Sequence, residues 1–304
     1  MNETRFIDVG HSQLAYRRVG TGPDVVFIHG WPLHSATFRH IVPELSADFT
    51  CHLFDLPGTG ESTWTEPRRI CMREHAKTVR SAIDAIGLER YAMIAHDSGG
   101  LIARLVAAGD PDRVSALVLG NTEVPAHVPW QVKVYVALAN VPLGSAALLS
   151  MLRIGAVRRS ALGFGGCFRD PHFVDGEFFD LFVRPLLESK RVAQGQMLLA
   201  KNIELDMAEA MPALHAKIPA PVRLIWGPED PFFPIDNARQ MLKQLAGPAD
   251  LVEIEGAKLF AHEEFPKRFA QECRQFLCDN LPNRRSCTEA GTPSQALRES
   301  DAVE

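Results

Sequence analysis

The stretch Ala95-His-Asp-Ser-Gly99 has the residue types and the spacing of a turn that presents one reactive side chain. An apolar run over residues 91–95 predicts a strand before the turn, and apolar residues at helical spacing over 101–106 predict a helix after it. Small residues two positions before and two positions after the reactive residue let neighbouring backbone pass close to such a turn. Two small residues flank Asp97 in this way, whereas centring the turn on Ser98 would put His96 at a small position. Asp97 is therefore the predicted nucleophile.

Strands and helices alternate on both sides of this turn. Strand patterns occupy residues 5–9, 13–18, 25–28, 50–54, 91–95, 114–119, 222–226 and 250–254, and helical patterns separate most of them. This alternation predicts an α/β fold with a mostly parallel, eight-stranded sheet and helices on both faces. The alternation stops over 124–217, where only helices are expected, so this region is predicted to be a helical insert. Residues 283–304 are polar and are expected to form a disordered tail.

The composition disfavours several classes of partner. The 304 residues carry a net charge of −5, with 46% hydrophobic and 23% charged residues, which gives no reason to expect nucleic acid or an anionic membrane. No signal peptide or bilayer-spanning stretch is visible, and the six scattered cysteines are expected to be free thiols, so a cytoplasmic location is expected. The glycines of 55–62 match no nucleotide-binding motif, and the cysteines form no metal-ligand pairs, so neither a cofactor nor a metal is expected. The chain is expected to be a monomer or a homodimer.

Four motifs, each placed at the end of a predicted strand, resemble those of the α/β-hydrolase fold superfamily. They are His29-Gly-Trp-Pro32, Asp55-Leu-Pro-Gly-Thr-Gly-Glu-Ser62, Ala95-His-Asp-Ser-Gly-Gly100 and Trp226-Gly-Pro-Glu-Asp-Pro231. The resemblance implies an α/β-hydrolase core made of 1–123 and 218–282, with a helical cap over 124–217. With aspartate at the turn, the nearest subgroups are the epoxide hydrolases and the haloalkane dehalogenases.

An aspartate at this position can attack saturated carbon without help from a base. A carboxyl with an ordinary pKa near ~3.9 is ionised at neutral pH, so it can displace halide or open an epoxide and become an alkyl ester. The resemblance implies that the backbone N–H groups of Trp31 and Ser98 form an oxyanion hole when water attacks this ester. The phenylalanines of the cap favour a small apolar substrate. His29, Trp31, Tyr135 and Leu259 are expected to contribute to its pocket.

The histidine that the resemblance requires for activating water is absent from its position. The superfamily pattern Gly-Ala-Gly-His-Phe aligns with Gly256-Ala-Lys-Leu-Phe260, so Leu259 stands where the histidine is expected. His262, three residues further on, is a candidate replacement base, although a local hydrogen-bonding role is the simpler interpretation. For the acid that supports a base, Asp230 and Glu123 each follow a predicted strand, and both stay open.

Three functions are therefore compatible with the sequence. The first is hydrolysis of an epoxide or a carbon–halogen bond through an alkyl ester on Asp97. The second is a non-hydrolytic reaction, as in an isomerase, lyase or cyclase, with Asp97 as base. The third is a non-catalytic binding protein that has kept the pocket but lost turnover. Forming the ester needs Asp97, whereas releasing it needs a base, so the fate of an adduct on Asp97 separates the three.

Overall fold

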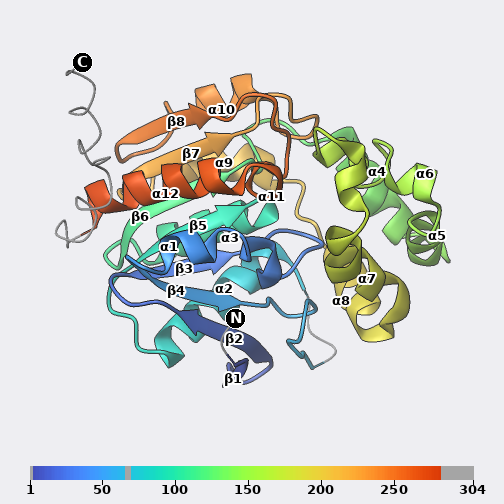
Figure 1. Cartoon of the computed structure of the whole chain (residues 1–304), viewed down its shortest axis with the longest axis horizontal. Coiled ribbons are helices and arrows are strands. Elements are labelled where there is room, and N and C mark those ends of the chain that lie inside the picture. Colours follow the sequence, from blue (N-terminus) through green and yellow to red (C-terminus); the bar gives the residue numbers. More distant parts are fainter. Residues whose placement is uncertain (1–2, 66–69, 282–304) are drawn as a thin grey trace, which may run out of the picture.

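One eight-stranded sheet forms the centre of the structure, a computed structural model that describes residues 3–65 and 70–281. The strands are β1 (Arg5–Asp8), β2 (Gln13–Val19), β3 (Asp24–Ile28), β4 (Thr50–Phe54), β5 (Tyr91–His96), β6 (Val114–Gly120), β7 (Val222–Trp226) and β8 (Ala249–Glu253). Their order across the sheet is β1-β2-β4-β3-β5-β6-β7-β8 (Figure 1). The β1–β2 and β2–β4 pairs are antiparallel and the other five pairs are parallel, so the predicted mostly parallel sheet is confirmed.

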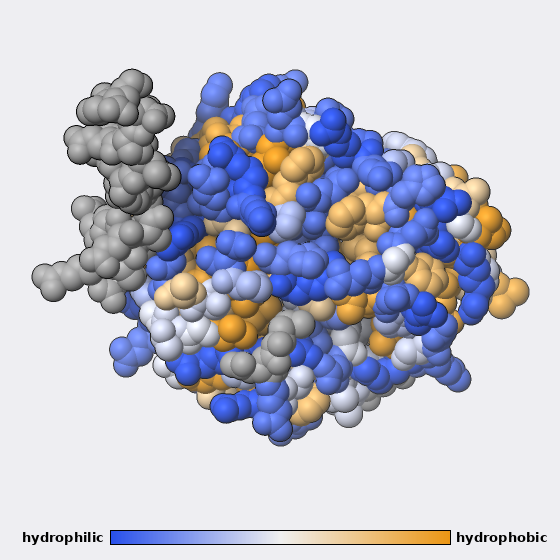
Figure 2. Space-filling model, in the orientation of Figure 1, coloured by the Kyte–Doolittle hydropathy of each residue, from blue (hydrophilic) through white to orange (hydrophobic). Residues whose placement is uncertain are grey.

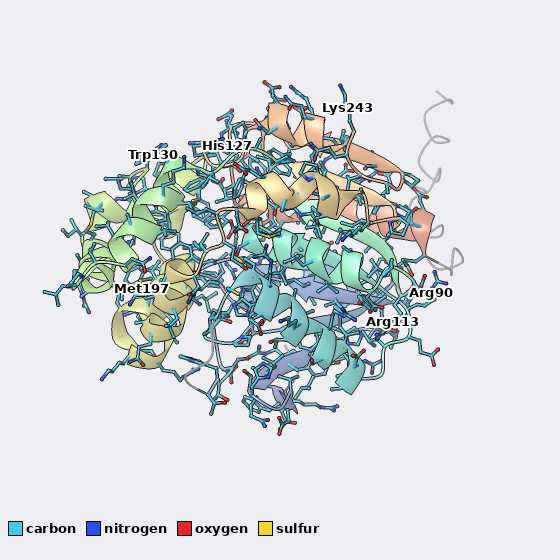
Figure 3. The ribbon with its side chains drawn as sticks, turned by 180° about the vertical axis from the view of Figure 1, so that it is seen from behind. Arg90, Arg113, His127, Trp130, Met197 and Lys243 are labelled. Atoms are coloured by element: carbon cyan, nitrogen blue, oxygen red, sulfur yellow. The ribbon has the colours of Figure 1, made fainter. Side chains whose placement is uncertain are left out.

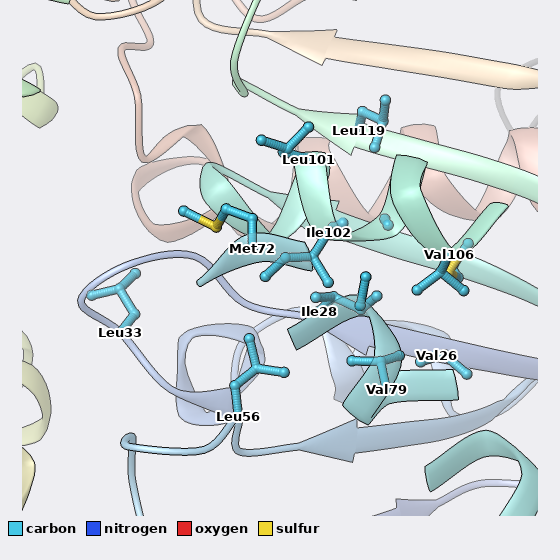
Figure 4. Close-up of a cluster of buried hydrophobic side chains, with 14 of the residues drawn as sticks. Val26, Ile28, Leu33, Leu56, Met72, Val79, Leu101, Ile102, Val106 and Leu119 are labelled. Carbon is cyan, nitrogen blue, oxygen red and sulfur yellow. The ribbon is translucent and has the colours of Figure 1, made fainter. Parts of the chain in front are cut away.

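Helices cover both faces of the sheet, because successive side chains of its central strands point to opposite faces and both sets are apolar. In β3, Val26 and Ile28 belong to one core cluster, and Val25 and Phe27 belong to the other. The first cluster lies under α2 (Met72–Ala85), α3 (Ser98–Gly109) and α10 (Ile235–Met241), and Figure 4 shows the side chains of α2 and α3 meeting those of β3. The second lies under α1 (Val42–Leu45) and α12 (Pro266–Asn280), which pack together.

A helical insert separates β6 from β7. Its helices gather at one end of the molecule, away from the antiparallel β1–β2 edge (Figure 1). They are α4 (Trp130–Ala139), α5 (Gly144–Met151), α6 (Gly155–Arg158), the short helical turns Gly165–Cys167 and Pro171–Val174, a π-helical turn (Phe179–Val183), α7 (Arg184–Glu188) and α8 (Lys190–Lys201). The predicted helical insert is therefore present where the strand and helix alternation stops.

The next helix, α9 (Met207–His215), belongs by its packing to the core rather than to the insert. It packs against α3, and the fully buried Arg104 of α3 lies within hydrogen-bonding distance of His215. The insert expected over 124–217 thus ends before α9. The tail expected over 283–304 lies outside the described residues.

Of the five cysteines within residues 3–65 and 70–281, one differs from expectation. Cys51, Cys71, Cys167 and Cys273 carry no disulfide, as the sequence predicted. Cys278, in α12, is disulfide-bonded, so the expectation of free thiols throughout is wrong there. Among the helices of residues 3–65 and 70–281, none is long and apolar enough to cross a bilayer.

Candidate active site

Asp97 sits at the apex of a sharp turn between β5 and α3. Its backbone has a φ of 52° and a ψ of −137°, a conformation that residues other than glycine seldom adopt. Hydrogen bonds hold the turn in place: the Asp97 amide donates to the Asn121 carbonyl at 2.9 Å, and the Asp97 carbonyl accepts from the Gly100 amide at 2.7 Å. A Cβ atom on Gly99 would overlap the carbonyl oxygens of Ile28 and His29. The small residue predicted after the nucleophile is thus required by close backbone packing.

Two backbone amides act on the carboxylate that this turn presents. The N–H groups of Ser98 and Trp31 hydrogen-bond to the Asp97 side chain and hold its pKa down. The Trp31 amide also lies 2.8 Å from Ser98 Oγ. A Cβ atom on Gly30 would collide with the Asp97 carboxylate, so the chain before Trp31 passes directly beside the reactive group. The two amides predicted for the oxyanion hole therefore come together at Asp97.

The net effect of its surroundings nevertheless raises the pKa of Asp97 well above the ordinary value. Burial is the main cause, and the negative charges of Glu123 and Asp230 add to it. These effects outweigh the stabilising amides of Ser98 and Trp31. The sequence analysis expected a carboxyl of ordinary acidity, and this expectation is wrong because it ignored burial and the two neighbouring acids.

A cavity of about 120 Å³ lies between the core and the insert, with Asp97 in its wall. Among the described residues that line it, Asp97 is the one carboxylate. Leu259, Tyr135 and Trp31 also line it, as predicted. The remaining lining residues are mostly apolar: Pro32, Val132, Leu148, Leu149, Met151, Leu152, Leu162, Gly163, Phe164, Cys167, Leu186, Met197, Ile203, Phe232, Phe233 and Phe260. Such walls suit a small apolar substrate.

A second cavity of about 80 Å³ reaches Asp97 from another side. Trp31 and Asp97 line both cavities, but this one also has polar residues in its wall, namely Ser98, Glu123, His127 and Glu204. Glu204 is paired with Arg73. The Nε2 atom of His127 donates to the Phe232 carbonyl at 2.9 Å, and Figure 3 places His127 near Trp130, toward the end of the molecule that carries the insert.

Glu123 follows β6 as predicted and lies against the fully buried Arg104. Its Oε2 atom is 3.7 Å from Arg104 Nη2, and its side chain is 21% exposed. Burial raises the pKa of Glu123, and the guanidinium opposes this shift. Glu123 is thus an acid that shares a cavity with Asp97.

Asp230 is buried behind Asp97 and does not line either cavity. Its two oxygens accept from the Asn121 side-chain amide and from the Phe232 backbone amide, both at 2.8 Å. Burial raises its pKa to about 7. Leu259 supplies no hydrogen-bonding group from its side chain, so Asp230 lacks the imidazole partner that the resemblance implied.

His262 does not take the place of the absent histidine. It is fully buried, lines neither cavity, and its Nε2 atom lies 2.7 Å from Thr37 Oγ1. Its ring packs beside His96, with 4.1 Å between centroids. The bond to Thr37 agrees with the local hydrogen-bonding role that was the simpler interpretation of His262, rather than with a role as replacement base.

His29 is also absent from the walls of both cavities, although the sequence analysis put it in the pocket. It is buried, its Nε2 atom accepts from the Leu56 amide at 3.0 Å, and its Nδ1 atom lies 3.1 Å from the Gly30 carbonyl. His29 therefore fixes the loop that follows β4 instead of contacting a ligand.

The sequence analysis missed four residues around Asp97: Arg104, Thr122, His127 and Cys167. Thr122 and Arg104 bond to each other at 3.0 Å beneath Glu123. A polar pair directly after a buried strand was the one signal available for Thr122. No sequence motif marks the other three residues, because they come near Asp97 only when α3 and the insert have folded.

Comparison with known proteins gives matches over nearly the whole chain. Residues 23–266 match the sequence model of the alpha/beta hydrolase fold family. Haloalkane dehalogenase 2 of Mycobacterium tuberculosis H37Rv is 30% identical over 272 residues, which cover 88% of this chain and 92% of that protein. A pimeloyl-[acyl-carrier protein] methyl ester esterase of Aliivibrio fischeri is 27% identical over 270 residues, covering 87% and 97%.

Two solved structures share the fold at lower sequence identity. The epoxide hydrolase CorEH superposes with a TM-score of 0.77 at 20% identity, covering 91% of this chain and 99% of that one. The haloalkane dehalogenase DbeA of Bradyrhizobium elkani superposes with a TM-score of 0.74 at 20% identity, covering 91% and 98%.

Proposed function

This chain belongs to the α/β-hydrolase fold family, and from that premise we propose that it hydrolyses a small apolar epoxide or alkyl halide through an ester on Asp97. The observation that carries the proposal is the presentation of the Asp97 carboxylate, at a strained turn, to a cavity with almost wholly apolar walls. The relatives named haloalkane dehalogenase and epoxide hydrolase support the same reaction class.

The first half of the reaction is a displacement at saturated carbon. One Asp97 oxygen attacks the carbon, and the carbon–halogen bond or one carbon–oxygen bond of the epoxide breaks as the ester forms. Apolar walls exclude water from this step and hold the substrate against the carboxylate.

The second half is attack of water on the Asp97 Cγ atom. The tetrahedral intermediate carries negative charge on one oxygen. In this proposal the N–H groups of Trp31 and Ser98, which hydrogen-bond to the Asp97 side chain, stabilise that charge. Collapse of the intermediate breaks the ester bond, releases the alcohol and restores the acid. A base must take the proton of the water, and at position 259 the chain offers leucine.

Intact-mass measurement tests the proposal. Incubation with 1-bromohexane or styrene oxide is expected to give an adduct or turnover, and Asp97→Asn is expected to give neither. A mass shift that survives in Asp97→Asn, or a wild type that gives neither adduct nor product with any epoxide or haloalkane tried, would overturn it.

Two observations favour a second candidate, a non-hydrolytic reaction with Asp97 as base. The pKa of Asp97 is raised, as suits a base, and Leu259 leaves the usual water-activating position empty of imidazole. For this candidate we expect bound ketones or similar carbon acids to exchange hydrogen for deuterium in D₂O without forming an adduct. Binding with neither exchange nor adduct would instead indicate a binding protein.

A further inference from the structure

Two carboxyl groups, those of Asp97 and Glu123, line the second cavity. Asp97 follows β5 and Glu123 comes shortly after β6, and the neighbouring parallel strands bring their carboxyl ends to the same edge of the sheet. Glu204 also lines this cavity, but Arg73 neutralises it. The protonation states of Asp97 and Glu123 therefore depend on each other and on the buried groups around them.

The hydrogen bonds of Thr122 are compatible with one proton on this pair. Thr122 Oγ1 lies 2.7 Å from the Asp97 carbonyl oxygen and 2.7 Å from Glu123 Oε2. A hydroxyl has one hydrogen to donate, and a carbonyl oxygen can only accept. If the Thr122 hydrogen goes to the Asp97 carbonyl, the short contact with Glu123 requires a hydrogen on the carboxyl. Thr122 then accepts from Glu123 and from Arg104 Nη2, at 3.0 Å, and all its bonding capacity is used.

The charge of Arg104 also indicates one proton on Asp97 and Glu123 together. Arg104 is fully buried, and its remaining contacts are neutral: the carbonyls of Gly100 and Glu123, the sulfurs of Met211 and Met241, and His215. The one buried positive charge of Arg104 balances one negative charge on the pair, whereas two ionised carboxylates would exceed it. The raised pKa values of Asp97 and Glu123 agree with this count.

We propose that Asp97 and Glu123 hold one proton between them, and that Glu123 acts as general acid and then as general base in place of the absent histidine, which makes an epoxide the substrate. This proposal rests on the proposed ester mechanism and goes further, because it names the proton carrier and selects between the two substrate classes.

The protons balance through the whole cycle for an epoxide. Ionised Asp97 attacks an epoxide carbon, the carbon–oxygen bond breaks, and the oxygen takes the proton of Glu123. Ionised Glu123 then removes a proton from the water that attacks Asp97 Cγ. As the ester bond breaks, Glu123 returns that proton to the leaving alkoxide. Asp97 is left protonated beside an ionised Glu123, and transfer of the proton between them restores the starting state. Epoxide and water have become a diol.

An alkyl halide uses this arrangement poorly. Halide leaves without a proton, so Glu123 stays protonated and is not ready to act as a base for the second step. The site also lacks an evident halide donor among the described residues, because the Trp31 indole N–H is engaged with the Gln196 carbonyl at 3.0 Å and Ser98 follows the nucleophile.

The experiment compares ester formation from styrene oxide and from 1-bromohexane by rapid quench and intact mass, in wild type and in Glu123→Gln. Glu123→Gln is expected to slow ester formation from the epoxide about 100-fold, the low end of what general acid catalysis contributes, and to leave the ester unhydrolysed. Ester formation from 1-bromohexane is expected to stay within a few-fold of wild type. Glu209→Gln, which removes an exposed carboxylate from α9, serves as the matched control.

The pH profile gives a second readout. Reaction with the epoxide needs one proton shared by Asp97 and Glu123. Its rate is therefore expected to decrease at both low and high pH. In Glu123→Gln the decrease at high pH is expected to disappear. The other ionisable groups facing the pair are Arg104 on α3, His127 and the Arg73-paired Glu204 on the cavity wall, and Asp230 behind Asp97. Glu123→Asp keeps an ionisable carboxyl, so its rate is expected to decrease at both low and high pH. This variant tests the proposal even if Glu123→Gln folds poorly.

Several results would overturn the proposal. Equal slowing of both substrates in Glu123→Gln would mean a structural role, and no slowing would mean no role. Selective loss with the epoxide in Tyr135→Phe instead would make Tyr135 the proton donor. An epoxide ester that persists in the wild type would exclude Glu123 as the base and leave ester formation itself intact. Failure of the wild type to form any adduct or product would reject the proposed function as well. This outcome differs from the others, which reject only the role of Glu123.

Discussion

At residue 259 a leucine lines the large cavity, which Asp97 also lines. Leu259→His is expected to speed hydrolysis of the Asp97 ester formed from 1-bromohexane by roughly 100-fold, because an imidazole there can take the proton of the attacking water. The measurement is the decay of the adduct mass after excess substrate is removed. Leu259→Met keeps an apolar side chain of similar volume and is the control. Equal decay in the two variants would show that the position lacks access to water.

Asp230 makes stability depend on pH through its buried carboxyl. Its folded pKa of about 7 exceeds the unfolded value of 3.8, so its contribution is present below pH 4 and is lost as the pH rises to 7. Relative to Asp230→Asn, the free energy of unfolding of the wild type is expected to fall by up to about 4 kcal/mol across this range. Urea titrations at pH 4.5 and 7.5 measure it. Parallel behaviour of the two proteins would contradict a raised pKa.

Site residues were easier to predict where their position depends on neighbours in the sequence than where it depends on distant contacts. Asp97, Ser98 and Trp31 were found from short motifs, since the steric demands of the turn act within a few residues. His29 was misplaced, and the hydrogen-bonding role of His262 was expected without its partner, because the direction of a buried imidazole depends on distant residues, such as Thr37 for His262. The proton count at Glu123 likewise depends on contacts that sequence spacing does not encode.

At the scale of elements, α8 packs closely against the core at two glycines, Gly195 and Gly58. A Cβ atom on Gly195 of α8 would lie 2.5 Å from the Cα atom and the carbonyl oxygen of Gly58. The neighbouring residue Gln196 accepts the Trp31 indole bond at 3.0 Å, so α8 also holds a wall of both cavities.

Gly195→Ala is therefore expected to push α8 away from the loop after β4. The cost is expected to be about 1–3 kcal/mol, as for overpacking elsewhere, and tryptophan fluorescence is expected to shift as Trp31 loses its partner. Thermal unfolding and fluorescence spectra measure the two effects. Gly155→Ala is the matched control, because its nearest contact would be the flexible Arg159 guanidinium at 3.4 Å. If the two variants behave alike, α8 is not seated by backbone contact.

The elements themselves were largely predictable, and β4 has the predicted bounds, Thr50–Phe54. What the sequence did not reveal is which side of an insert helix faces the core. Exposed large hydrophobic residues lie mostly on the insert, where Figure 2 shows apolar surface: Trp130, Val134, Val141, Leu143, Ile154 and Leu162. Because α4 and α5 are apolar on their outer as well as their inner sides, periodicity gives no direction.

At the scale of the whole molecule, the insert and the sheet share one hydrophobic core. Phe168 and Phe178 of the insert belong to the same buried cluster as Val26 and Ile28 of β3. Phe260, on the core side, lies with its ring centroid 5.1 Å from that of Phe168. The large cavity lies within this shared core, with walls from both parts. The insert is thus not expected to unfold by itself.

A ligand in the large cavity is therefore expected to stabilise the whole chain in one step. In Asp97→Asn, which cannot form the ester, 1-hexanol at 100 times its dissociation constant is expected to add about 2.7 kcal/mol to the free energy of unfolding. Calorimetry is expected to show a single transition that moves to higher temperature. Val132→Trp, which fills the cavity from the α4 side, is expected to remove the shift without splitting the transition. Two transitions, with one of them unmoved by ligand, would show that the insert and the sheet unfold separately despite their shared core.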